Sequence, residues 1–175
     1  MATPELSGQE VSAIRALLDA AFEHDQHGGF TDHDWQHALG GVHFVADVDG
    51  AIVGHAAVVE RDLRVAGRPL RTGYVEAVAT DPARQRRGIG TAVMREVAKH
   101  IADRYELGAL GTGSHRFYER LGWVIWQGPS SVRTTGGERP TPEEDGYILV
   151  LRTRSTPPLD LTAPISCEWR PGDVW

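Results

Sequence analysis

The chain has 175 residues, of which 41% are hydrophobic and 24% are charged, and its formal net charge is −6. This length predicts one compact domain over residues 1–175, and the apolar content excludes intrinsic disorder. Because an acidic chain repels phosphate backbones, nucleic acid is excluded as a main partner. A cationic small molecule suits this charge better.

The apolar runs are too short for a membrane helix, and the first residues lack the basic start and apolar stretch of a secretory signal. We therefore expect a cytoplasmic protein that makes no membrane contact. A single cysteine, Cys167, excludes an internal disulfide and a cysteine-built metal cluster.

Helical periodicity dominates the first 40 residues. Apolar residues recur at three- and four-residue spacings over 7–22, and Ser7 with Glu10 forms a capping-box pattern at the start of this segment. A second, short helix is predicted after Thr31 and ends at Gly40-Gly41.

Three strands of an antiparallel meander are predicted next. Segments 42–48 and 51–61 flank Asp49-Gly50, a strong hairpin signal, and the second strand runs on toward Val65. The third strand covers 71–80 and ends at Asp81-Pro82.

Helices and strands alternate in the second half of the chain. Helices are expected over 89–101 and 115–121, strands over 107–110, 123–126, 147–151 and 165–169, and a loop over 128–142. The last two strands are expected to form a terminal hairpin. This order predicts an α/β or α+β fold with a sheet covered by helices.

A glycine-containing segment, Gln85-Arg86-Arg87-Gly88-Ile89-Gly90, lies between the third strand and the helix that follows. Unpaired N–H groups at such a helix start can surround a phosphate, and the two glycines allow the ligand to approach the backbone closely. The alternative is an ordinary turn with solvated arginines.

This segment follows Val78-Ala79-Thr80, and together they resemble the acyl-CoA pyrophosphate loop of the GCN5-related N-acetyltransferases. Further segments resemble the aminoglycoside 2'-N-acetyltransferases. They are Phe30-Thr31-Asp32, Asp34-Trp35, 37–41, 73–76, 105–110, Gly122-Trp123 and 167–175.

The resemblance implies the fold of that superfamily, a mixed central sheet flanked by helices, with a splay between the parallel strands 71–80 and 107–110. It also implies acetyl-CoA as cosubstrate and no metal. The residues that match the acetyl-CoA site are Val78, Ala79, Thr80, Gln85, Arg86, Arg87, Gly88, Ile89 and Gly90.

Two residues match catalytic positions of the resembled family. Glu76 is the candidate general base, because an amine that attacks a thioester must lose a proton. Its alternatives are a solvent-facing strand residue or an ion pair with Arg71. Tyr118 matches the tyrosine that protonates the leaving thiolate, and its alternative is core packing. No acyl-enzyme is expected, because no histidine lies beside Cys167 in the sequence.

The resemblance also assigns carboxylates to the amines of the substrate, namely Asp34, Glu76, Glu144, Asp173 and the terminal carboxylate of Trp175. It implies direct acetyl transfer to an aminoglycoside in a ternary complex, which would confer antibiotic resistance. The acceptor is either a deoxystreptamine drug or kasugamycin. The other interpretations are acetylation of a polyamine or a peptide amine, and a non-catalytic acetyl-CoA sensor.

The sequence departs from the family pattern near its start. Gly28-Gly29 stands where the family has an acidic residue, and the missing contact favours a less cationic acceptor such as kasugamycin. The strand before the first helix is absent, so the sheet either lacks an edge or takes one from a second copy in a homodimer. His33 and His37 are a weak alternative metal site, with Asp34 and His24 or His27 nearby but no convincing third ligand.

Overall fold

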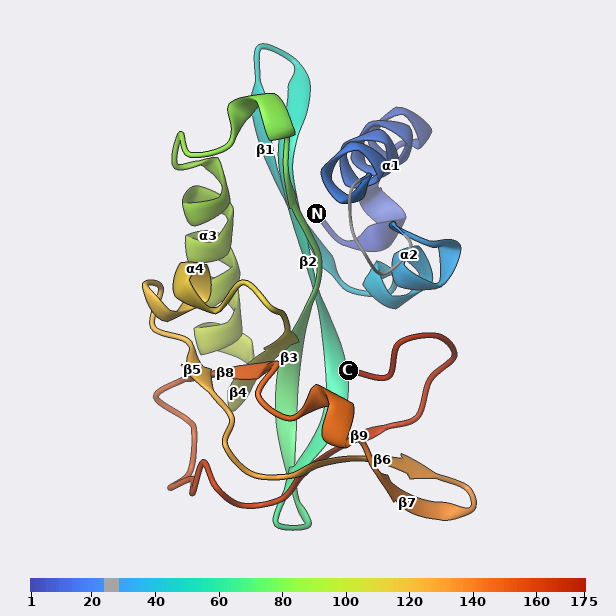
Figure 1. Cartoon of the computed structure of the whole chain (residues 1–175). Helices are drawn as coiled ribbons and strands as arrows, with labels where there is room; N and C mark the ends of the chain where they lie inside the picture. Colours follow the sequence, from blue (N-terminus) through green and yellow to red (C-terminus); the bar gives the residue numbers. More distant parts are fainter. Residues whose placement is uncertain (24–28) are drawn as a thin grey trace. The chain divides into compact units, whose positions relative to one another are not determined.

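The computed structural model describes residues 1–23 and 29–175 (Figure 1). Contacts between Cα atoms divide the chain into two compact units. Unit 1 comprises Met1–Val59 and Val75–Val97, and unit 2 comprises Glu60–Tyr74 and Ala98–Trp175. A single domain over residues 1–175 stays a prediction.

The helical elements are η1 (Thr3–Glu5), α1 (Gly8–Phe22), α2 (Asp32–Ala38), η2 (Pro82–Arg84), α3 (Ile89–Arg104), α4 (His115–Glu119) and η3 (Pro142–Glu144). The strands are β1 (Val42–Val48), β2 (Ala51–Val65), β3 (Arg68–Thr80), β4 (Leu107–Gly111), β5 (Val124–Ile125), β6 (Ser130–Thr134), β7 (Gly137–Pro140), β8 (Ile148–Arg152) and β9 (Ile165–Glu168).

The two helices at the start of unit 1 begin as the sequence predicts. Ser7 Oγ accepts a hydrogen bond from Glu10 N, and the Glu10 carboxylate accepts one from Ser7 N. Thr31 and Asp34 form the same reciprocal pair at the start of α2. The predicted capping box at Ser7 and the predicted helix start at Thr31 are therefore confirmed, and each cap satisfies N–H groups that the helix itself leaves unpaired.

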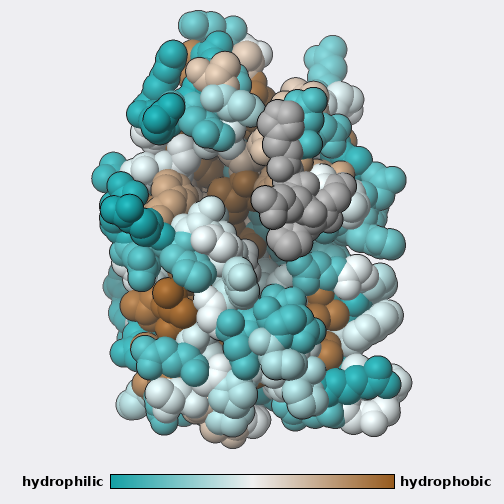
Figure 2. All heavy atoms as spheres, viewed as in Figure 1, coloured by the Kyte–Doolittle hydropathy of each residue, from teal (hydrophilic) through white to brown (hydrophobic). Residues whose placement is uncertain are grey.

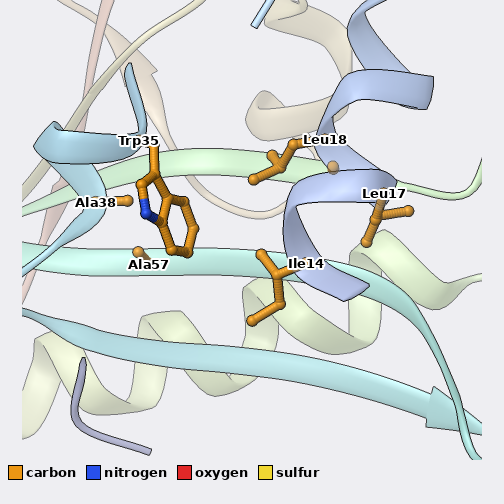
Figure 3. Close-up of a cluster of buried hydrophobic side chains, with 7 residues drawn as sticks. Ile14, Leu17, Leu18, Trp35, Ala38 and Ala57 are labelled. Atoms are coloured by element: carbon orange, nitrogen blue, oxygen red, sulfur yellow. The ribbon is translucent and has the colours of Figure 1, made fainter. Parts of the chain in front are cut away.

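The hydrophobic core of unit 1 lies where α1 and α2 cover one face of β2 and β3 (Figure 3). In Figure 3 the Trp35 ring lies beside Ala38 and Ala57, with Ile14 and Leu18 of α1 on its other side. The buried members of this cluster are Ile14, Leu17, Leu18, Trp35, Ala38, Ala57 and Ala79. Burial of apolar surface thus ties both helices to the sheet.

Helix α3 packs on the opposite face of β2. Side chains alternate along a strand, so Gly54 and Ala57 face opposite sides. A Cβ atom at Gly54 would lie 2.8 Å from Ile89 Cγ2 and 3.3 Å from Val93 Cγ2. The absent side chain therefore allows the first turns of α3 to approach the strand closely.

Two histidines are buried together on adjacent strands of unit 1. His43 on β1 is 1% exposed and His55 on β2 is 0% exposed. His43 Nδ1 lies 3.0 Å from His55 Nε2, and His55 Nδ1 lies 2.7 Å from the carbonyl oxygen of Ala77. Burial lowers the pKa of both imidazoles from 6.5 to about 4, and both are therefore neutral at neutral pH.

In unit 2 the described strands follow the order β5-β8-β4-β3-β2-β9-β6-β7, with β2 and β3 represented by their residues in that unit. The sheet is mixed, because β3 pairs in parallel with β4 whereas β4 pairs in antiparallel with β8. The register of β3 with β4 runs from Thr72↔Leu107 to Tyr74↔Ala109, while β4 continues against β8 to Gly111. The parallel pairing thus stops within the segment where a splay was expected.

Two predictions for the second half of the chain are wrong. Residues 128–142 contain a hairpin of β6 and β7 rather than a loop, and β7 is exposed along its length, so burial imposes no apolar alternation on it. The terminal hairpin is also absent, because β8 pairs with β4 and β5 whereas β9 pairs with β2 and β6.

Before α1 the structure has a single β-bridge and, as expected, no strand. Ala2 forms an isolated antiparallel bridge with Val42, and no strand precedes α1 in residues 1–7. Among the residues that the structure describes, no helix combines the length and apolar character needed to cross a membrane. Figure 2 shows one face on which hydrophobic residues reach the surface in separate patches among hydrophilic ones.

The histidine pair predicts a pH-dependent stability. With the pKa near 4 when folded and near 6.5 when unfolded, the unfolded chain binds protons between these values that the folded chain does not. The free energy of unfolding should therefore fall as the pH drops from 6.5 to 4, and these groups should add no pH dependence above 6.5. Urea unfolding at several pH values measures this change in the free energy of unfolding.

The control for this prediction is His55→Phe, which keeps a ring of similar size and removes one titrating group. Carboxylates contribute the same background to both proteins, so the variant should show a shallower loss of stability below pH 6.5. Equal slopes in the two proteins would contradict the prediction.

Candidate active site

The residues predicted to act together are distributed over the two units. Unit 1 contains Asp34, Glu76, Val78, Ala79, Thr80 and the loop residues Gln85, Arg86, Arg87, Gly88, Ile89 and Gly90. Unit 2 contains Tyr118, Glu144, Asp173 and Trp175. Their surroundings within each unit decide which chemistry each group is able to perform.

Glu76 lies on β3, half-buried, directly before an irregularity of the strand. Ala77 has a φ of 51°, in the left-handed region that non-glycine residues rarely adopt. Its carbonyl oxygen accepts the hydrogen bond from His55. We interpret a left-handed residue inside a strand as a β-bulge, and bulges redirect neighbouring side chains and are frequent beside active sites.

The three residues after the irregularity differ in burial. Ala79 is buried in the cluster of α1 and α2, whereas Val78 and Thr80 are half-buried. An acetyl-CoA role for these residues uses main-chain groups, so it is compatible with the packing of their side chains.

The loop from Gln85 to Gly88 is exposed and has two left-handed residues, Arg86 with a φ of 61° and Gly88 with a φ of 84°. Gly88 O accepts the hydrogen bond from Ala92 N at 2.9 Å, which makes Gly88 the N-cap of α3. The N–H groups of the first helical turn have no acceptor inside the helix, and the helix dipole makes this end positive. The geometry suits a phosphate-bearing ligand.

The start of this loop is held by Asp81. Its N–H donates to Val53 O at 2.9 Å, its Oδ1 accepts from Ala83 N at 2.9 Å, and its Oδ2 lies 3.5 Å from Arg84 Nε. Arg84 is therefore engaged with Asp81, whereas Arg86 and Arg87 are exposed within the loop itself.

Asp34 has a local structural task. Its Oδ2 accepts hydrogen bonds from Thr31 N and Thr31 Oγ1, both at 2.8 Å. The carboxylate thus caps α2, which accounts for an aspartate at this position without a substrate. His33 and His37 lie on the same short helix, whereas His24, His27 and Gly28 lie outside the described residues. Within the described residues, no group of three or more metal-ligating side chains is present.

Tyr118 is buried on α4 and packs edge-to-face against Phe117 and Trp123, with ring centroids 4.9 and 6.1 Å away. Burial raises the pKa of its phenol above the ordinary value, so the hydroxyl keeps its proton at neutral pH. A protonated phenol is the form that a general acid requires.

Carboxylates gather near the end of unit 2. Burial raises the pKa of Glu144, and the negative charges of Asp173 and Glu143 raise it further. Asp145 has a different environment, because its Oδ1 accepts from Ser130 N and Ser130 Oγ, both at 2.8 Å. Glu144 and Asp173 therefore repel each other, and a bound cation would relieve this repulsion.

The last residue is firmly held. Trp175 is 4% exposed, and its indole Nε1 donates to Thr141 Oγ1 at 3.0 Å. Arg170 Nε donates to Asp173 O at 2.8 Å, and Arg170 Nη2 donates to Trp175 O at 3.4 Å. The carbonyl oxygen of Trp175 consequently lies beside an arginine.

Cys167 is buried, and burial raises the pKa of its thiol to about 11. A thiol with a raised pKa is a poor nucleophile at neutral pH. This supports the expectation that the reaction forms no acyl-enzyme.

The sequence analysis missed three residues that shape these sites, namely His43, His55 and Thr141. A signal for the histidines was present, because each interrupts an otherwise apolar strand. No local pattern marks Thr141, whose partner Trp175 lies 34 residues away.

Comparisons with known proteins show the family of the chain. The model of the acetyltransferase (GNAT) family matches residues 11–123. The chain is 41% identical over 177 residues to an aminoglycoside 2'-N-acetyltransferase of Mycolicibacterium fortuitum, covering 99% of this chain and 89% of that protein.

Solved structures share the fold at low sequence identity. A GNAT family acetyltransferase from Brucella melitensis in complex with acetyl-CoA has a TM-score of 0.61 at 21% identity, covering 91% of this chain and 90% of that one. A GCN5-related N-acetyltransferase from Kribbella flavida has a TM-score of 0.59 at 18% identity, covering 71% of this chain and about a third (33%) of that one. The chain therefore belongs to the GNAT family and is an acetyl-CoA-dependent N-acetyltransferase.

Proposed function

We propose that the protein transfers the acetyl group of acetyl-CoA to the 2'-amine of an aminoglycoside, by direct attack in a ternary complex. The observation that carries this proposal is the 41% identity to an aminoglycoside 2'-N-acetyltransferase over 99% of the chain. Acetylation would remove a positive charge from the drug, which is the basis of the proposed role in antibiotic resistance.

Acetyl-CoA would bind to unit 1. The start of α3 and the exposed loop from Gln85 to Gly88 supply N–H groups and two arginines for its pyrophosphate, and the main chain of 78–80 holds the pantetheine arm. Binding in this way would orient the thioester for attack, and such orientation supplies a large part of the rate in bimolecular transfers.

The chemistry requires two proton transfers. The amine nitrogen forms a bond to the thioester carbon and gives its proton to Glu76, and the carbon–sulfur bond then breaks. Tyr118 gives its proton to the departing thiolate. Its phenol is protonated at neutral pH, as this step requires, although burial raises its pKa and makes it a weaker acid than an exposed tyrosine.

An acidic surface would attract the acceptor. Glu144, Asp173 and Trp175 belong to the same unit, and burial together with the negative charges of Asp173 and Glu143 raises the pKa of Glu144. An ammonium group bound there would be stabilised by charge-assisted hydrogen bonds. Asp34 contributes less in this proposal, because its carboxylate already caps α2.

Glu76→Gln should lower kcat by roughly 10²–10⁴-fold, the usual effect of losing a general base, with little change in acetyl-CoA affinity. Tyr118→Phe should have a smaller effect, because thiolate is a good leaving group and water partly replaces the acid. Release of free thiol measures turnover, and calorimetry measures binding. A Glu76→Gln enzyme that keeps normal turnover across the pH range would refute the base assignment.

Gly54→Ala should displace the start of α3, because the added methyl group would lie 2.8 Å from Ile89 Cγ2. Overpacking of this kind costs about 1–3 kcal/mol of stability, and we expect weaker acetyl-CoA binding as well. The matched control is Gly8→Ala, where nothing lies within 4 Å of the added Cβ. If Gly54→Ala bound acetyl-CoA as tightly as the control, the close approach would have no role in forming the site.

The acceptor is decided by steady-state kinetics on tobramycin, kasugamycin, spermidine and a lysine peptide at equal ionic strength. We expect an aminoglycoside to be used best, and Asp173→Asn to raise its KM because one charged contact is lost. Preference for kasugamycin would agree with the departure of the sequence at Gly28-Gly29, where the family has an acidic residue. Preference for spermidine or the peptide would overturn the proposed function, and binding of acetyl-CoA without any turnover would indicate a sensor.

A further inference from the structure

A chain of hydrogen bonds runs from the loop after α2 to the irregular part of β3. Gly40 N lies 3.0 Å from Thr3 Oγ1, which lies 2.9 Å from His43 Nε2. The chain continues through His43 Nδ1 and His55 Nε2, 3.0 Å apart, and ends at Ala77 O, 2.7 Å from His55 Nδ1. All of its members belong to unit 1.

The last acceptor sets the direction of the whole chain. A carbonyl oxygen only accepts, so His55 carries its proton on Nδ1 and accepts at Nε2. His43 must then donate from Nδ1 and accept at Nε2, where the hydroxyl of Thr3 donates. Thr3 Oγ1 and the two imidazoles each accept one hydrogen bond and donate the next one along the chain that ends at Ala77. Both rings are therefore neutral.

The target of this chain is a strained residue. Ala77 has a φ of 51° although it carries a side chain, and such a conformation persists only when its surroundings hold it. The hydrogen bond from His55 fixes the peptide between Ala77 and Val78. Without it, β3 would be able to relax toward regular strand geometry.

Relaxation would move the preceding side chain. A bulge redirects the side chains beside it, and a regular strand would present them at different angles. Glu76 directly precedes Ala77 and is the general base of the proposed function, on which this inference rests. A base displaced by a fraction of an ångström loses much of its effect.

We propose that His55, oriented by His43, is a positioning residue for acetyl transfer: it holds the bulge at Ala77 and thereby aims the Glu76 carboxylate. His55 touches neither substrate in this role and acts through the main chain. Loss of a purely structural histidine would mainly lower the free energy of unfolding. Loss of His55 should instead lower kcat, with little change in the binding of either substrate.

The experiment compares His55→Phe with His55→Asn. Phe keeps the ring and loses the donor, whereas Asn carries an N–H₂ group two bonds from Cβ, as imidazole carries Nδ1. We expect His55→Phe to lower kcat on tobramycin by roughly tenfold, with KM and the acetyl-CoA Kd little changed. The kcat of His55→Asn should exceed that of His55→Phe by about threefold or more, a ratio that corresponds to the free energy of one ordinary hydrogen bond.

A double-mutant cycle tests whether His55 acts through Glu76. The variant Glu76→Gln/His55→Phe should have the same kcat as Glu76→Gln alone, because a positioning residue has no effect once the base is gone. Multiplicative losses would overturn the proposal. The stability control is Ile165→Val, a change at a buried residue of unit 2 outside the proposed site, which should lower Tm while kcat stays near the wild-type value.

Imidazole ¹⁵N spectra of the wild-type protein provide a readout that needs neither turnover nor a variant that folds. Nδ1–H tautomers for His43 and His55 support the proposal, and an Nε2–H tautomer for His55 overturns it. Absence of turnover on both tobramycin and kasugamycin in the wild-type protein would count against the proposed function, while the spectra would still judge the His55 contact. Normal kcat in Glu76→Gln would overturn both.

Discussion

Strand β3 carries the candidate chemistry because it does not finish as a regular strand. Its parallel pairing with β4 stops at Tyr74, and three residues later the backbone turns left-handed at Ala77. A strand with complete ladders uses its N–H and C=O groups internally, so an interrupted one is better suited to bind a ligand through its main chain. In the proposed positioning role the hydrogen bond from His55 to Ala77 holds this part of the strand, and burial keeps the two histidines neutral at neutral pH.

The second requirement is a helix start that a phosphate is able to reach. Gly54 allows Ile89 and Val93 to pack against β2, and Asp81 holds the turn that leads into the loop. The left-handed residues Arg86 and Gly88 then lead the exposed chain into α3. Close packing on one side and an exposed loop on the other are the features on which the proposed pyrophosphate site depends, in a protein whose net charge is negative.

Charge is arranged differently in unit 2. Glu144 and Asp173 repel each other, and Trp175 is held by its burial, by Thr141 and by Arg170. Groups that repel one another in the free protein gain most when a cation binds, so this arrangement favours an acceptor with several amines. Burial also raises the pKa of Tyr118, whose phenol is protonated at neutral pH.

Local signals in the sequence determined the helix caps at Ser7 and Thr31, the Asp49-Gly50 hairpin and the loop before α3, because each depends on residues a few positions apart. The family resemblance added the candidate roles of Glu76 and Tyr118. Tertiary structure decided the β6–β7 hairpin and the partners of β9, since exposed strands need no apolar alternation and pairing joins distant segments. It also decided the contact of His55 with Ala77, 22 residues away, and that of Trp175 with Thr141. Such contacts form when the sheet brings distant strands together, and no local pattern encodes them.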